Sequence, residues 1–212
     1  MNNERYPKLI SWLIAAWFVF ALLASTFHLF QTLPALPPIA LGLAALIPII
    51  VFVTWFRVSS EFRACVLTLN PRTLTMIQSW RIAGYVFLVL YMYGILPGSF
   101  ALPAGWGDVA IGLTAPFVAM KLVGRSHRAA FIFWQILGMA DLVTALGMGT
   151  ASRFLSTSQL TMAPMTMMPL SLIPTFAVPF FFILHIISIA QARRWSETVH
   201  VRGGEPLAGT AV

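Results

Sequence analysis

Two carboxylates lie inside long apolar segments of this sequence, where an acid is costly to keep. Asp108 lies in the segment 105–122 and Asp141 in the segment 130–148. An ionised Asp at the centre of a membrane helix costs about 2.5–3.5 kcal/mol, whereas each Leu, Ile, Phe or Val returns only about 0.3–0.6 kcal/mol. Such acids face a bundle interior or a wet cavity and mark proton or cation pathways. The alternative is a structural role in which each acid fixes helix packing, with the helix dipole favouring Asp108.

Two more polar side chains share the apolar segments. Gln135 lies in the same segment as Asp141, and His185 lies in the segment 169–192. We therefore predict a binding or translocation site formed by Asp108, Asp141, His185 and Gln135, in which the imidazole can serve a proton path. The alternative for His185 is a simple hydrogen bond within the bundle.

Small residues accompany both acids at helical spacing and allow helices to approach closely in lipid. We expect them to bring the segments 105–122 and 130–148 together at a polar seam. The two faces are Asp108, Gly112, Ala115 and Ala119, and Gly138, Asp141, Ala145 and Gly149.

Other residues with chemical potential form weaker patterns. His28 and His185 could bind a haem, but their predicted depths differ by roughly 22 Å at 1.5 Å per residue, and one iron needs both ligands at one level. The methionines of the run 162–168 could bind Cu(I), although an apolar loop on the membrane is the simpler interpretation. No nucleotide, zinc or hydrolase motif is present. We expect no enzyme, no metal and no cofactor.

Prolines punctuate the last apolar segment. Pro169, Pro174 and Pro179 recur every five residues. A proline inside a helix removes one hydrogen bond and kinks the axis. We expect a bent helix here, and the carbonyls freed near Leu170 and Thr175 could line a polar cavity.

The elements that must position these residues are membrane helices. The chain of 212 residues is 59% hydrophobic and 9% charged, with a mean hydropathy of +0.86, and a soluble fold of this size cannot bury so much apolar surface. We predict an all-α polytopic bundle with six transmembrane helices in one domain, residues 1–195, followed by a disordered cytoplasmic tail, residues 196–212. The predicted spans are 9–30, 39–56, 80–97, 105–122, 130–148 and 169–192, with a loop at 97–107.

The distribution of basic residues predicts the orientation. With both termini in the cytoplasm, twelve of the 13 Lys and Arg residues, Arg81 included, fall on the inner side and only Arg153 falls outside. We expect a multi-pass protein of the cell inner membrane whose cytoplasmic face meets anionic lipids. We also expect a homo-oligomer and no nucleic-acid partner.

Several motifs resemble those of a family of small uncharacterised bacterial multi-pass integral membrane proteins. They are FALPAGWGD at 100–108, GLTAP at 112–116, Ala140-Asp141-Leu142, and the segment from Ile173 to His185. The resemblance covers roughly the C-terminal two-thirds and implies a bacterial cytoplasmic membrane, but no activity or substrate.

Three functions remain open from the sequence. The first is transport of a small solute, proton or cation through the seam around Asp108 and Asp141. The second is an accessory or scaffold membrane protein whose buried acids only lock helices together. The third is a haem- or quinone-linked membrane subunit.

Overall fold

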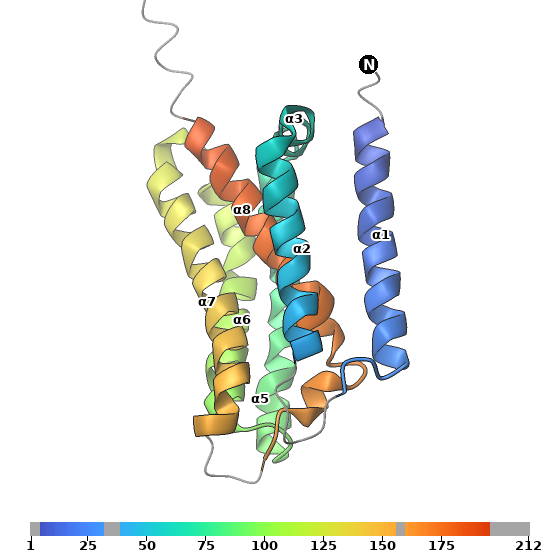
Figure 1. Ribbon diagram of the computed structural model, residues 1–212. Helices are drawn as coiled ribbons and strands as arrows, with labels where there is room; N and C mark the ends of the chain where they lie inside the picture. Colours follow the sequence, from blue (N-terminus) through green and yellow to red (C-terminus); the bar gives the residue numbers. More distant parts are fainter. Residues whose placement is uncertain (1–4, 32–38, 156–159, 196–212) are drawn as a thin grey trace, which may run out of the picture.

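The protein is an all-helical bundle in its computed structural model, which describes residues 5–31, 39–155 and 160–195 (Figure 1). No strand occurs within these ranges. The predicted tail 196–212 lies outside the described residues, as do residues 32–38 between the first two predicted spans. The helices are α1 Arg5–Thr26, α2 Ile39–Val58, α3 Ser60–Leu67, α4 Pro71–Ile77, α5 Tyr85–Met92, α6 Gly98–Lys121, α7 Arg128–Leu155 and α8 Val178–Arg194, with 3₁₀ turns η1 Gln78–Gly84, η2 Arg125–His127 and η3 Ala163–Thr166 and a π-helical turn η4 Ile173–Ala177.

Five of the described helices are long and apolar enough to cross a membrane. This confirms an all-helical chain with several membrane-compatible helices. The predicted span 105–122 is not among the five; its residues 105–121 lie in α6, a helix of 24 residues. The five are Tyr6–Thr26, Ile39–Val58, Pro71–Met92, Arg125–Ala151 and Ile173–Arg194.

The predicted loop at 97–107 is wrong, because α6 already begins at Gly98. Glycine and proline are poor helix formers, which favoured a loop in the sequence. Packing overrides that preference here. Phe100, Ala101 and Ala104 are buried against Phe87 of α5 and hold the first turns of α6 in the core.

The predicted span 80–97 is also different in detail. Helical structure runs from α4 through η1 to α5, and α6 lies directly against η1. A Cβ atom at Gly112 would lie 2.4 Å from the backbone nitrogen of Ile82. Only a glycine permits this approach of the two backbones, which brings the side chains of η1 to α6.

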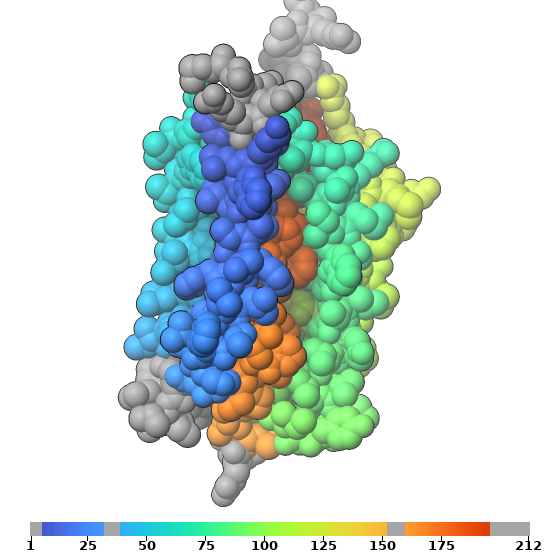
Figure 2. All heavy atoms as spheres, turned by 90° about the vertical axis from the view of Figure 1, so that its right-hand side faces the viewer, coloured from blue at the N-terminus to red at the C-terminus, as the bar shows by residue number. Residues whose placement is uncertain are grey.

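A π-helical turn, η4, interrupts the last segment where the sequence predicts a bend; it contains Pro174 and precedes Pro179. Pro179 has no N–H to donate to the carbonyl of Thr175, four residues earlier. The indole Nε1 of Trp17 donates to that oxygen at 3.2 Å instead. This bond attaches α1, which lies at the outside of the bundle (Figures 1 and 2), to η4.

The long helices alternate in direction, so that α2, α6 and α8 all end at the end of the bundle where α1 begins (Figure 1). Their last turns carry Arg57, Lys121, and Arg193 with Arg194. Basic residues therefore gather at one end of the bundle, as the sequence predicted for one membrane face.

Candidate functional site

Arg81 is the centre of a polar site in the bundle, with a side chain that is 1% exposed. The sequence predicts Arg81 at the inner membrane face, but the structure places its side chain inside the bundle. In a 3₁₀ helix, residues three apart share one face, and the buried residues of η1 are Gln78, Arg81 and Gly84. This face points into the bundle, where the amide of Gln78 donates to the carbonyl of Phe181 in α8 at 3.1 Å.

Both predicted acids pair with Arg81. Its Nε donates to Oδ1 of Asp108 in α6 at 2.7 Å, and its Nη2 donates to Oδ2 of Asp141 in α7. Its Nη1 donates to the carbonyl of Gly138 at 3.1 Å. The guanidinium thus joins η1, α6 and α7, and its fork-shaped set of donors suits such a bridge. When both acids are ionised, this ion cluster carries one net negative charge.

His185 extends the network toward α4. Its Nε2 lies 3.3 Å from Nη1 of Arg81, and its Nδ1 contacts the amide oxygen of Gln135. Because arginine can only donate, Nε2 must accept, and the proton must lie on Nδ1, which donates to Gln135. The imidazole is therefore neutral in this arrangement.

The network continues from Gln135 to the N-terminal end of α4. The amide nitrogen of Gln135 donates to Oγ1 of Thr75 at 3.4 Å, and that hydroxyl donates to the carbonyl of Pro71 at 2.8 Å. Thr75 and Gln135 are fully buried. A continuous chain of hydrogen bonds thus runs from the ion cluster to the first residue of α4, towards the basic end of the bundle.

Gly138 makes room for this chain. A Cβ atom at this position would lie 2.4 Å from Cε1 and 2.5 Å from Nε2 of His185. The face of α7 that the sequence analysis identified by its small residues therefore presses against the imidazole of α8.

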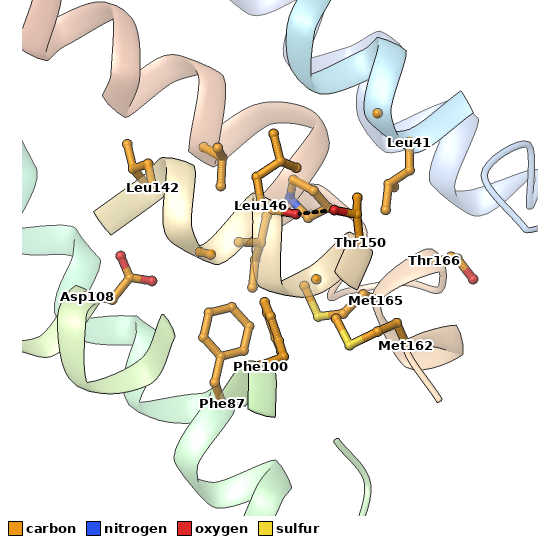
Figure 3. Close-up of a pocket in the computed structure, with 16 residues that line it drawn as sticks. Leu41, Phe87, Phe100, Asp108, Leu142, Leu146, Thr150, Met162, Met165 and Thr166 are labelled. Carbon is orange, nitrogen blue, oxygen red and sulfur yellow. Dashed lines mark hydrogen bonds between the residues drawn. The ribbon is translucent and has the colours of Figure 1, made fainter. Parts of the chain in front are cut away.

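A mostly apolar pocket reaches the ion cluster at Asp108 (Figure 3). Its volume is about 80 Å³, enough for several water molecules at 10–15 Å³ each. In Figure 3 the carboxylate of Asp108 lies at one edge of the pocket, and Met162 and Met165 lie at the other.

The structure brings together all four residues that the sequence analysis selected, and it adds Arg81 and Thr75. Two signals for Arg81 were present in the sequence. Two buried acids need a buried cation, and Arg81 lies three residues from both Gln78 and Gly84, which is the spacing of one 3₁₀ face. No comparable signal in the sequence points to Thr75.

The other candidates lie elsewhere. The side chain of His28 is exposed and contacts Gln31, whereas both ring nitrogens of His185 already have partners. Met165 is buried against Phe87 and Phe100 in the bundle, whereas the interpretation of the methionine run as an apolar loop on the membrane stays a prediction. Among the described residues, no three His, Cys, Asp or Glu side chains are grouped to hold a metal ion.

Comparisons with known proteins place the chain in a family. Neither the curated proteins nor the solved structures gave a match. Residues 36–193 match a family model described as "Domain of unknown function (DUF8737)". This match begins just before α2 and ends within the last turn of α8, so it contains the whole polar network and leaves out α1. The chain belongs to the DUF8737 family.

Proposed function

We propose that the protein is a proton- or cation-coupled carrier of the bacterial inner membrane, with the Arg81–Asp108–Asp141 cluster as its coupling site. The observation that carries this proposal is the cluster's position between a pocket and a buried hydrogen-bond chain. Ionisable groups in the membrane interior are costly and serve proton and ion pathways by default. One proton or one monovalent cation neutralises the net charge of the cluster.

The permanent charge of Arg81 favours a carrier over an open pore. A fixed guanidinium repels protons and cations that approach along a pathway, as the arginine of water-selective pores does. Passage past Arg81 therefore requires that the carboxylates of Asp108 and Asp141 exchange the guanidinium for the incoming proton or cation. Such an exchange couples a bound proton to a change of conformation.

The proposed membrane arrangement has six spans and both termini in the cytoplasm. The five apolar helices supply five crossings, and α6 supplies the sixth. At 1.5 Å per residue its 24 residues extend about 36 Å, more than the roughly 30 Å of a hydrocarbon core. Its polar residue Asp108 pairs inside the bundle, which removes the main obstacle to a membrane position. Anionic lipids would contact the basic end, and six spans are few for a carrier, so we also propose a homo-oligomer.

Proton flux into proteoliposomes tests the proposal. The purified protein is reconstituted with a pH-sensitive dye inside the vesicles, and an imposed pH gradient drives the flux. We expect flux with the wild type and none with Asp141→Asn, which keeps the side-chain shape but removes the charge. The matched control is Glu61→Gln, because Glu61 lies outside the cluster and contacts Tyr6.

The rival functions predict other results. A folded wild type without flux, together with a loss of folded Asp141→Asn protein, would favour a scaffold whose acids only lock helices. A Soret band in the purified protein would favour a haem-linked subunit.

A further inference from the structure

The pocket beside the ion cluster has two chemically different parts. One end of it is the carboxylate of Asp108, and its body is lined mainly by apolar side chains from α2, α5, α6, α7, η4 and α8 and by Met162 and Met165. Among the residues that the structure describes, no Lys, Arg or His lines the pocket. A ligand that fills it therefore meets one negative group, two threonine hydroxyls and otherwise apolar side chains.

Asp108 has an oxygen available for such a ligand. Its Oδ1 accepts from Nε of Arg81, but within the described ranges no protein group donates a hydrogen bond to Oδ2. The side chain is 14% exposed and lies on the pocket wall. A carboxylate oxygen can accept more than one hydrogen bond, so a donor in the pocket would complete the shell of Asp108.

The other two polar residues of the pocket do not compete for this role. The hydroxyl of Thr150 donates to the carbonyl of Gly147 at 2.8 Å, and that of Thr166 donates to the carbonyl of Ala163 at 2.7 Å. Both hydroxyl protons are thus used within their own helical turns, and both oxygens are neutral acceptors. Among the described residues that line the pocket, the charged group is Asp108.

The walls suit the apolar body of a small cation. Phe87 and Phe100 pack edge to face, with ring centroids 5.3 Å apart, and Met162 and Met165 lie nearby (Figure 3). Aromatic faces attract organic cations, and thioethers adapt to irregular apolar shapes. The volume of about 80 Å³ restricts the ligand to a few heavy atoms.

We propose that this pocket binds a small protonated amine, with its ammonium group at Oδ2 of Asp108 and its short alkyl body between the phenylalanine and methionine side chains. This inference rests on the proposed carrier function and names its substrate class. The ammonium group and a coupling proton would compete for one negatively charged cluster, so the carrier would exchange the amine for a proton.

Direct binding to the purified full-length protein tests the proposal without any transport step. The probes are n-propylammonium, propan-1-ol and propionate, which share a carbon body and differ in head-group charge. We expect n-propylammonium to bind at least about tenfold more tightly than the other two, because only it pairs with a carboxylate in an apolar site. Equal binding of the three probes would overturn the proposal.

Matched variants locate the site. Asp108→Asn and Asp141→Asn each remove one carboxylate from Arg81, but only Asp108 lines the pocket. We expect the Asp108 variant to lose at least about tenfold in affinity, and more than the Asp141 variant. Wild-type affinity in Asp108→Asn would overturn the proposal.

A variant that leaves the ion cluster intact covers the case in which Asp108→Asn does not fold. Ala145→Leu fills the pocket, and Ala110→Leu adds the same atoms at an exposed position of α6. We expect only the first to abolish amine binding, and unchanged binding would contradict the assigned pocket. Proton flux without amine binding would overturn this inference alone, whereas amine binding without proton flux, even with n-propylammonium supplied on the opposite side of the vesicle membrane, would overturn the carrier function.

Discussion

Gly138 of α7 and His185 of α8 are in such close contact that no side chain fits between them. The carbonyl of Gly138 also accepts a hydrogen bond from Arg81. One glycine thus positions both the imidazole and the guanidinium, and it connects helix packing to the chemistry of the site.

The first prediction concerns this contact. Gly138→Ala places a methyl group against the His185 ring and should destabilise the protein by about 1–3 kcal/mol, the usual cost of overpacking a core. Thermal unfolding in detergent measures the change. Gly147→Ala on the same helix is the control, because nothing lies within 4 Å of its added Cβ atom. Equal melting temperatures for the two variants would contradict the close packing of α7 on α8.

The second prediction concerns the chain from His185 to Thr75. Gln135→Leu removes both the acceptor of His185 and the donor to Thr75, and it leaves the buried Nδ1 of His185 unpaired at a cost of about 1–3 kcal/mol. We expect proton flux in proteoliposomes to fall about tenfold, which corresponds to about 1.4 kcal/mol. Thr75→Ser keeps the hydroxyl and should keep the flux. Full flux in Gln135→Leu would show that this chain does not contribute to proton flux.

The third prediction concerns the attachment of α1. Trp17→Phe keeps the ring but removes the donor to the Thr175 carbonyl, so we expect a loss of about 1 kcal/mol or more in unfolding free energy. Trp12→Phe is the matched control on the same helix, because Trp12 is 75% exposed. If both variants unfold alike, the bond between α1 and η4 does not contribute to stability.

The fourth prediction concerns membrane orientation. In a Cys65→Ala background, which removes the one cysteine of the chain, Tyr93→Cys and Ser126→Cys each introduce a single exposed thiol, at opposite ends of the bundle. A membrane-impermeant maleimide should label Tyr93→Cys in intact cells and should label Ser126→Cys only after lysis. Labelling of Ser126→Cys in intact cells would reverse the proposed topology.

The sequence predicted the helical class and the four polar residues, because both follow from the cost of polar groups in apolar segments. It misplaced the start of α6, since the preference of Gly98 and Pro103 for a loop is outweighed by the burial of Phe100 and Ala101. It also misplaced Arg81, which follows Trp80 at the edge of an apolar run. The interior position of Arg81 depends on the 3₁₀ geometry of η1, and hydropathy does not report that geometry.

Arg81 and Asp141 form an ion pair inside the bundle, and a double-mutant cycle measures the strength of this pair. Arg81→Met and Asp141→Asn are made singly and together, and the unfolding free energy is measured in detergent. Each single variant leaves a buried charge with fewer partners and should cost up to about 3–5 kcal/mol. We predict that the double variant costs less than the sum of the two by at least about 2 kcal/mol. Additive costs would show that the two side chains do not interact and would contradict an ion pair between Arg81 and Asp141.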